Sequence, residues 1–307
     1  MLAPLAGITD LPFRNLVSGF GAGLVVSEMI ASGEFLTARP GTREKAELGA
    51  QVENTSVQIA GREAGPMAEA ARMVVDLGAR VVDINMGCPA KKVTGGWSGS
   101  ALMQVPDHAL RLIEAVVAAV DVPVTLKTRL GWNDDALNAP DIARSAESAG
   151  VQMVVIHGRT RCQFYKGKAD WSAIRKTREA IDIPLVANGD ITDAVTARTA
   201  LEESGADGVM IGRGAQGAPW VLAEVAAELY GTPRPKIPEG TDLIDMISEH
   251  YEAMLTFYGG ELGNRVARKH LGWYMDRSNP PGDIRKAILT EKVPANVMRM
   301  IPQAMAA

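Results

Sequence analysis

The chain has 307 residues, of which 47% are hydrophobic and 22% are charged, a composition of folded globular proteins that excludes a disordered chain. Its formal net charge of −4 argues against a uniformly basic surface but permits a local basic patch for a polyanion, and charges such as Glu114 interrupt every apolar stretch before membrane-spanning length. Two cysteines are too few for a disulfide framework and no basic, apolar leader begins the chain, so we expect a cytoplasmic protein.

Eight short apolar runs recur along the chain and predict parallel strands that are buried on both faces. Gly78, Gly150 and Gly205 each close a helical pattern directly before such a run, as a helix C-cap does. Two other runs open with Pro123 and Pro184, where a missing N–H costs little. The predicted strands lie near residues 2–6, 23–27, 55–60, 80–85, 123–128, 152–157, 184–188 and 207–211.

Amphipathic stretches separate most of these runs and predict helices, for example at residues 63–77, 106–120, 171–181 and 192–204. Eight strands alternating with helices over about 230 residues predict an α/β fold of the TIM (β/α)8 barrel type. A doubly wound sheet is the alternative, but eight units and an early first strand favour the barrel.

The last quarter of the chain has a different pattern. Residues 231–240 contain three prolines and two glycines, which is the composition of a linker. Helical patterns follow without further strand signals. We therefore predict a barrel domain over residues 1–235 and a small all-helical C-terminal domain over residues 241–307.

In a TIM barrel the active site forms at the C-terminal ends of the strands. Nearly every predicted strand of this chain ends in a polar or glycine-rich element, and a structural protein would have no reason to do so uniformly. These elements are residues 3–7, 58–61, 85–89, 127–129, 157–159, 188–190 and 212–214.

The glycines after the last two strands predict a phosphate site, because backbone N–H groups at a helix N-terminus favour an anion. Plain turn glycines are the alternative. Residues 212–217 also match a dinucleotide fingerprint by letter, but the acidic residue that this motif needs about 20 positions later is not convincingly present. We therefore prefer the phosphate site.

Two strand-end residues carry open interpretations. Burying a lysine such as Lys127 at the end of a strand costs free energy unless a negative charge pairs with it. It would pair either with an anionic cofactor atom or with a barrel carboxylate such as Asp83, and the residues alone favour neither. His157 would bind phosphate or cofactor, or would be a satisfied core histidine, which is slightly favoured.

Cys88 lies between Gly87 and Pro89 on a predicted turn at the barrel mouth. Free cysteines are more often small buried hydrophobes than catalysts, but a thiol that is protonated at neutral pH can donate a proton there. Cys162 is interpreted as structural. Because the two cysteines and four histidines are scattered, we predict no metal site.

Basic residues cluster twice along the chain. Arg159, Arg161, Lys166 and Lys168 surround two aromatic residues without an intervening acid, and residues 265–286 hold six basic residues against two acidic ones. Positive charge interleaved with aromatic side chains suits a folded RNA. A solvated helix face is the alternative, and charge alone slightly favours it.

With these motifs assembled, the chain resembles the tRNA-dihydrouridine synthase family, and most closely its bacterial B-type subfamily. The resemblance covers essentially the whole chain. Any one of its motifs is a weak match, but five in order are strong. The matching motifs lie at residues 3–10, 83–89, 157–161, 188–190 and 268–274.

The resemblance implies an FMN-binding TIM barrel followed by a helical domain that helps to bind tRNA. It implies reduction of the uracil C5=C6 bond in the tRNA D-loop, with NADPH reducing FMN, a hydride passing from FMN to C6, and Cys88 protonating C5. It also implies the residues that bind the cofactor, which are Pro4, Leu5, Ala6, Gln58, Lys127, His157, Asn188, Gly189, Asp190, Gly212 and Arg213.

We add as a hypothesis of our own a set of residues that contact the RNA, with no membrane and no obligate protein partner involved. These residues are Asn85, Arg159, Arg161, Arg265, Arg268, Lys269, Arg285 and Lys286. The chain departs from the family in beginning at the first barrel strand, so we expect a thinner barrel floor, and in carrying Leu5 where methionine is commoner.

Three other functions compete with this one. An FMN-dependent barrel oxidoreductase that acts on a small pyrimidine-like substrate would not need the basic helical region. An RNA-binding protein could keep the flavin without catalysis, and a phosphate-binding barrel would hold no flavin at all.

Overall fold

The computed structural model describes residues 1–37, 43–49 and 52–305. Within these ranges the parallel strands form one sheet in the order β1-β3-β4-β5-β6-β7-β8, with β2 paired to β3. The strands are β1 (Val25–Val26), β2 (Ile30–Ala31), β3 (Thr55–Ala60), β4 (Val81–Asn85), β5 (Val124–Arg129), β6 (Met153–His157), β7 (Leu185–Asn188) and β8 (Gly208–Met210).

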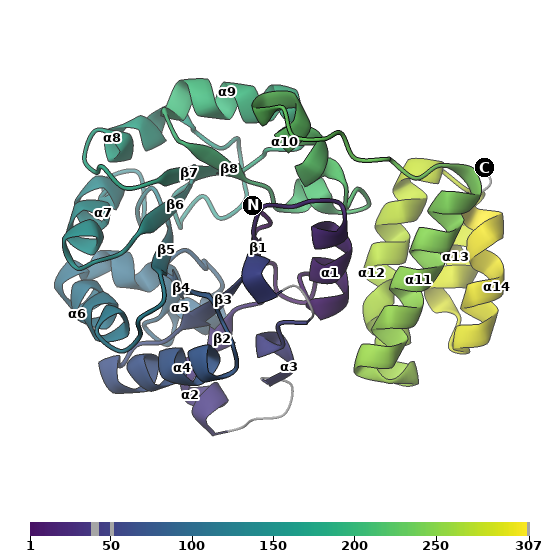
Figure 1. Ribbon diagram of the computed structural model, residues 1–307, viewed down its shortest axis with the longest axis horizontal. Coiled ribbons are helices and arrows are strands. Elements are labelled where there is room, and N and C mark those ends of the chain that lie inside the picture. The colour runs from purple at the N-terminus through teal and green to yellow at the C-terminus, as the bar shows by residue number, and fades with distance from the viewer. Residues whose placement is uncertain (38–42, 50–51, 306–307) are drawn as a thin grey trace.

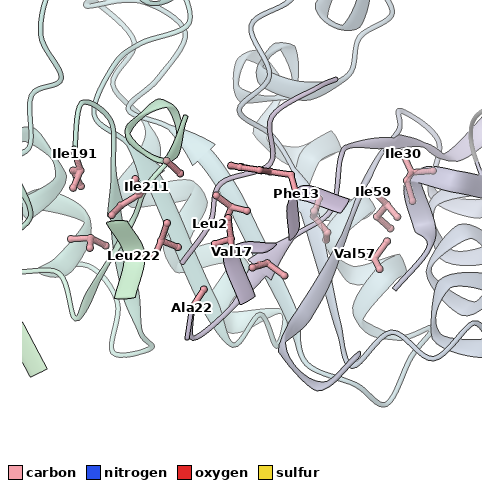
Figure 2. Packing of buried hydrophobic residues seen from close by; sticks show 14 of the residues in the cluster. Leu2, Phe13, Val17, Ala22, Ile30, Val57, Ile59, Ile191, Ile211 and Leu222 are labelled. Atoms are coloured by element: carbon pink, nitrogen blue, oxygen red, sulfur yellow. The ribbon is translucent and has the colours of Figure 1, made fainter. Parts of the chain in front are cut away.

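The sheet closes on itself through one residue near the N-terminus. Leu2 forms parallel bridges to both Val25 and Ile211, and so joins β1 to the chain just after β8. Figure 2 shows Leu2 between Ile211 on one side and Phe13 on the other, within the buried hydrophobic cluster. The predicted barrel fold is confirmed, although the strand predicted at residues 2–6 is reduced to this bridge and β2 was not predicted.

Helices cover the outside of the barrel (Figure 1). In α6 the buried residues Ala109, Leu112, Ile113 and Val116 recur at the three- and four-residue spacing that places one apolar stripe against a sheet. The helices of this layer are α1 (Leu11–Gly19), α2 (Ser32–Leu36), α3 (Arg43–Ala46), α4 (Ala64–Asp76), α6 (Pro106–Val117), α7 (Ala139–Ser148), α8 (Arg175–Arg178), α9 (Ala194–Ser204) and α10 (Val221–Tyr230).

Short helices lie in the loops of the barrel. They are α5 (Lys91–Thr94) and the 3-10 turns η1 (Val52–Asn54), η2 (Gly99–Gln104), η3 (Ser172–Ile174) and η4 (Arg213–Ala215). Because α5 and η2 both follow β4, and η4 follows β8, three of these short elements stand at the end of the barrel where the strands finish.

The inside of the barrel has an apolar layer below a polar one. Val155 and Val186 belong to a small buried cluster with Ala3, Val26 and Met210. His157 and Asn188 follow Val155 and Val186 by two residues, so they face the same interior one layer nearer the C-terminal ends of the strands. The apolar layer fills the barrel floor, which leaves the polar layer at its mouth.

The C-terminal region is a bundle of four helices, α11 (Gly240–Tyr258), α12 (Gly260–Ser278), α13 (Gly282–Thr290) and α14 (Pro294–Met305). Figure 1 shows the bundle on the side of the barrel that carries α1, and α1 and α11 are in contact. The Tyr258 hydroxyl donates a hydrogen bond of 3.0 Å to Asp10 Oδ2 across this contact. Within the described ranges, no helix combines the length and the apolar character needed to cross a membrane.

Candidate active site

A cavity of about 750 Å³ opens at the C-terminal ends of the strands. It brings together residues from the loops or ends of eight parts of the barrel that are far apart in the sequence. Every cofactor-binding residue predicted from the family resemblance lines it, as do Cys88 and Asn85. The predicted residues in its wall are Pro4, Leu5, Ala6, Gln58, Asn85, Cys88, Lys127, His157, Asn188, Gly189, Asp190, Gly212 and Arg213.

Lys127 lies at the floor of the cavity and is held by an amide rather than by a carboxylate. Its Nζ donates a hydrogen bond of 3.1 Å to Asn188 Oδ1, and His157 Nδ1 lies 3.0 Å from the same oxygen. Burial, reinforced by the charge of Arg129, lowers the pKa of Lys127 to about 8. The ammonium group therefore stays mostly protonated at neutral pH and has no ion pair that neutralises it among the described residues.

His157 is a neutral side chain in this arrangement. Burial, together with the charges of Lys127, Arg129 and Arg159, holds its pKa well below the usual value. A neutral imidazole that donates from Nδ1 to Asn188 keeps Nε2 as an acceptor, and Arg159 Nη1 lies 3.3 Å from that nitrogen. The ring is therefore fixed in both tautomer and orientation.

A chain of hydrogen bonds links the barrel interior to the backbone of Cys88. Thr125 and Gln58 donate to Asp83 at 2.6 Å each, and Asn85 Nδ2 donates to Gln58 Oε1 at 2.8 Å. Asn85 Oδ1 in turn accepts the Cys88 N–H at 3.0 Å. Strand register brings these side chains together, because β4 pairs Asp83 with Gln58 on one side and with Thr125 on the other.

The buried carboxyl of Asp83 is the unusual member of this chain. Burial raises its pKa to about 6, although both hydrogen bonds and the charge of Lys127 oppose the rise. The sequence offered Asp83 only as a possible ion-pair partner for Lys127. Its actual contacts are Gln58 and Thr125, so it orients the residues that lead to Cys88.

Cys88 is half-buried at the cavity wall, and a later residue of the same loop hydrogen-bonds to its carbonyl. The backbone N–H and the hydroxyl of Ser100 both donate to the Cys88 carbonyl, at 3.1 and 2.9 Å. A Cβ on Gly99 would lie 2.8 Å from that carbonyl oxygen, so only glycine fits this close approach. Cys162 is exposed instead and does not line the cavity.

The loops after β7 and β8 form the opposite wall. A Cβ on Gly214 would lie 2.6 Å from the Ile191 carbonyl, and one on Gly189 would lie 2.8 Å from the Ala169 side chain. Gly214 therefore lets the loop after β8 pack closely on the loop after β7, and Gly189 lets the loop after β7 pack closely on the loop after β6. Gly212, Arg213 and Gly214 all line the cavity at this wall.

Asp190 holds two arginines at this wall. It accepts bonds from both terminal nitrogens of Arg159, from Arg213 Nη2 at 3.1 Å and from the Ala169 N–H at 2.8 Å. Burial opposes ionisation of this carboxyl, but the bonds from Arg159 and Ala169 and the arginine charges outweigh burial and lower its pKa.

Arg129 is a residue of the site whose role the sequence did not indicate. It lines the cavity, and its guanidinium donates to the carbonyls of Gly87, Thr160 and Phe164 at 2.7 to 3.0 Å. It thus joins the loop that carries Cys88 to the loop after β6. Its position two residues after Lys127 was the available signal, because alternate residues of a strand face the same side.

The residues predicted to contact RNA are spread over three settings. Asn85 lies inside the cavity. Arg159 is 1% exposed and saturated by Asp190 and by the carbonyls of Lys166 and Gly167, so it cannot reach a ligand at the surface. Arg161 stacks over the Trp132 ring at 4.6 Å and bonds Thr94.

The remaining predicted RNA residues lie in the helical bundle. Arg265, Lys269 and Lys286 are exposed, whereas Arg268 donates to the Glu291 carbonyl and Arg285 pairs with Asp276. A Cβ on Gly7 would lie 3.2 Å from Lys269 Nζ. Since Gly7 directly follows the cavity-lining Ala6, this lysine brings a positive charge from α12 to the rim of the site.

The arrangement of this cavity agrees with the comparisons to known proteins. The family model named dihydrouridine synthase matches residues 1–299. This chain belongs to the dihydrouridine synthase family. It is therefore an enzyme, and within the described ranges no group of three or more His, Cys, Asp or Glu side chains is placed to hold a metal ion.

Several relatives match this chain over nearly their full length. A probable tRNA-dihydrouridine synthase of Rhodobacter capsulatus is 64% identical over 306 residues, which is 99% of this chain and 94% of that protein. One from Rhizobium leguminosarum is 55% identical, with the same shares covered. The tRNA-dihydrouridine synthase B of Xanthomonas campestris is 46% identical over 96% of this chain and 89% of its own length.

Proposed function

We propose that this enzyme reduces the C5=C6 bond of a uridine in the D-loop of tRNA to 5,6-dihydrouridine. FMN is the proposed flavin and NADPH the proposed reductant. The observation that carries the proposal is that a buried cation, Lys127, and a half-buried thiol, Cys88, face one cavity opposite two glycine-rich loops with an arginine. The names of the relatives, which are 46% to 64% identical, support tRNA as the substrate.

The residues of the cavity fit FMN. The backbone cradle at Gly189 and Gly212–Gly214, together with Arg213, offers the glycine approach and the positive charge that a phosphate needs. Lys127 and Gln58 would hold the edge of the flavin ring, with His157 and Asn188 beside it and residues 4–6 lining it by their backbones. When bound, FMN supplies the hydride that reduces C6, which no side chain can supply.

The protein side chains would hold charge and deliver a proton. Lys127 is already desolvated and positive, so it would stabilise negative charge next to it at little further cost in desolvation. Asn188 and the neutral His157 would keep its Nζ aimed into the cavity. Cys88 Sγ would donate a proton to C5 of the uracil, and Asn85 would fix the backbone of that cysteine.

The target uridine would leave the folded RNA to enter the cavity, at an unstacking cost of a few kcal/mol. We infer that residues 241–307 act as the RNA-binding domain of a barrel that spans residues 1–235, because Lys269 extends from α12 to the cavity rim. Exposed Arg265 and Lys286 would add phosphate contacts. We place this activity in the cytoplasm, and it needs no obligate protein partner.

The proposal is tested with the absorbance spectrum of the purified protein, recorded anaerobically. A flavin band should be present, should bleach when NADPH is added and should return when unmodified tRNA is added. If free pyrimidines reoxidise the flavin and tRNA does not, the enzyme acts on a small molecule instead. A protein that binds no FMN after reconstitution would overturn the cofactor assignment.

A further inference from the structure

Two aromatic residues at the barrel mouth have a backbone conformation that side chains of their size rarely adopt. Among the described residues, Trp97 and Phe164 have φ of 55° and 57°, in the left-handed region. Asp190 and Asn279 share this region, but short polar side chains tolerate it. Trp97 follows the end of α5, where its N–H and that of Ser98 bond to the carbonyls of Thr94 and Val93, a position that glycine normally takes. Bulky residues held there mark strain, and strain of this kind clusters at functional sites.

Burial accounts for only part of the aromatic surface at these two positions. Trp97 is 56% exposed and Phe164 is 40% exposed. A glycine or asparagine would relieve the backbone strain at either position, yet both positions keep a large ring that stays partly exposed. The aromatic surface that both residues present to solvent therefore calls for a ligand.

Phe164 stands at the cavity wall in a fixed setting. Its ring packs edge-on against Tyr165, with centroids 4.9 Å apart. The guanidinium carbons of Arg129 and Arg213 lie 5.5 and 5.6 Å from the centre of the Tyr165 ring. Arg129 also binds the Phe164 carbonyl at 2.9 Å, so both the backbone and the ring of Phe164 are positioned before any ligand arrives.

Trp97 lies on the loop that carries Cys88. Its N–H donates to the Thr94 carbonyl at 3.1 Å, and Ser100, three residues later, donates twice to the Cys88 carbonyl. Arg161 Nη2 reaches Thr94 Oγ1 at 3.4 Å, which connects this loop to the one that carries Phe164. Trp97 and Phe164 thus belong to two linked loops that both form the mouth.

The charges on these loops point to one class of ligand. Residues 88–100 and 157–169 contain no aspartate or glutamate, and they expose Lys91, Lys92, Lys166 and Lys168. Exposed aromatic rings beside unopposed positive charges are the arrangement that binds unstacked nucleobases and their phosphates. An apolar protein partner would not need the lysines.

We propose that Trp97 and Phe164 are stacking platforms for the unpaired bases of tRNA that neighbour the target uridine. This inference rests on the proposed function. Stacking on these rings replaces the base–base stacking that is lost when the uridine enters the cavity. The lysines on the same loops form ion pairs with the RNA phosphates. The platforms therefore favour an RNA loop over a free pyrimidine.

The test compares Trp97→Ala and Phe164→Ala with the wild-type holoenzyme, by the anisotropy of labelled, unmodified tRNA. Each substitution should weaken binding by about fivefold to a hundredfold, the value of one base stacked on an aromatic ring. Trp97→Phe and Phe164→Tyr should keep most of the affinity, while Trp97→Leu should behave as the alanine variant does. In Trp97→Ala, whose side chain does not line the cavity, flavin content and the rate of reduction by NADPH should not change.

Tyr230→Ala is the matched control, because Tyr230 is 55% exposed and its hydroxyl contacts the Asp207 carbonyl at the opposite end of β8. It should bind tRNA as the wild type does. Trp97→Gly, which relieves backbone strain at a side chain that is 56% exposed, should weaken tRNA binding without lowering the melting temperature. A merely structural role requires the reverse, which is a lower melting temperature with unchanged binding.

The proposal is overturned if the wild type converts uridine in tRNA while the alanine and glycine variants bind tRNA as tightly as it does. A wild type that forms no dihydrouridine in tRNA would instead refute the proposed function, and this inference with it. The two failures are thus distinguished by the wild-type product assay alone.

Discussion

The carboxylate of Asp190 accepts two parallel hydrogen bonds from the guanidinium of Arg159, from Nη1 to Oδ1 at 3.0 Å and from Nη2 to Oδ2 at 2.5 Å. The side chain of Arg159 is 1% exposed and that of Asp190 is 28% exposed. The pair therefore places a buried cation directly behind the wall of the cavity. Because Asp190 also binds Arg213, we infer that it serves a phosphate site by positioning Arg213, since a carboxylate would itself repel an anion.

Replacing Asp190 with asparagine should destabilise the protein by on the order of 3 kcal/mol, because Arg159 would be left as an unpaired buried charge. The free energy of unfolding in urea measures this loss. Arg213→Met is the control, since the Arg213 side chain is 56% exposed and its ion pair is worth about 1 kcal/mol or less. It should lower the affinity for FMN while leaving stability nearly unchanged.

The same pair makes a prediction about pH. The pKa of Asp190 is lowered in the folded protein, so its carboxylate stabilises the fold above the ordinary unfolded value near 4 and loses that effect as the pH falls through the lowered value. The wild type should therefore lose stability below about pH 4 more steeply than Asp190→Asn does. Equal slopes would show that the Arg159 pair does not depend on ionisation of this carboxyl.

Lys127 should make the flavin-free protein more stable in alkaline solution. Its pKa is about 8 in the folded protein, below the ordinary lysine value of 10.5. The unfolded chain therefore binds more protons between these two values, and stability rises with pH across that window. Relative to Lys127→Met, the wild type should gain up to about 3 kcal/mol between pH 8 and pH 10.5. A difference that does not vary with pH would contradict the lowered pKa.

Substitution of Cys88 by alanine should slow formation of dihydrouridine by about 100- to 10,000-fold, the usual value of a positioned general acid. Reduction of the flavin by NADPH should be unaffected, because the cysteine acts only on the RNA substrate. Single-turnover assays on unmodified tRNA separate the two steps. Cys162→Ala is the matched control for loss of a thiol, and wild-type product rates in Cys88→Ala would refute the general-acid role.

Lys269→Ala should weaken tRNA binding and reduce the slope of log affinity against log salt by about one, as expected for one lost phosphate contact. Titrations of labelled tRNA at several salt concentrations provide this slope. Arg144→Ala, on the outer helix α7, removes an exposed positive charge distant from the bundle and should leave the slope unchanged. An unaltered slope in Lys269→Ala would mean that α12 does not contact the RNA backbone at this position.

Much of the barrel could be predicted because a parallel strand buried on both faces must be apolar along its length. The runs predicted at 55–60 and 123–128 nearly coincide with β3 and β5, and the helix predicted at 106–120 contains α6. Because the C-terminal ends of all the strands lie at one end of the barrel, the polar residues there are brought together. Lys127, His157 and Asn188 could therefore be assigned to one site. The strand predicted at residues 2–6 is not formed in full, because only Leu2 forms bridges to the neighbouring strands.

The family motifs placed the same residues at the site and added their chemistry, which the strand pattern could not. Neither source indicated that Arg159 is buried. A charged residue in a basic loop is ordinarily exposed, and only the carboxylate of Asp190, 31 residues later in the chain, makes its burial tolerable.

The sequence by itself determined the order of strands and helices, the cavity and most of its wall, since these follow from apolar periodicity and from residues adjacent in the chain. Only the tertiary structure decided which partner each polar group has. Lys127 donates a hydrogen bond to Asn188 and forms none with Asp83, which accepts one from Gln58 instead. Trp97 is largely exposed and has a backbone conformation that is rare for a large side chain. Such pairings depend on strand register and loop packing between distant segments, which local pattern does not encode.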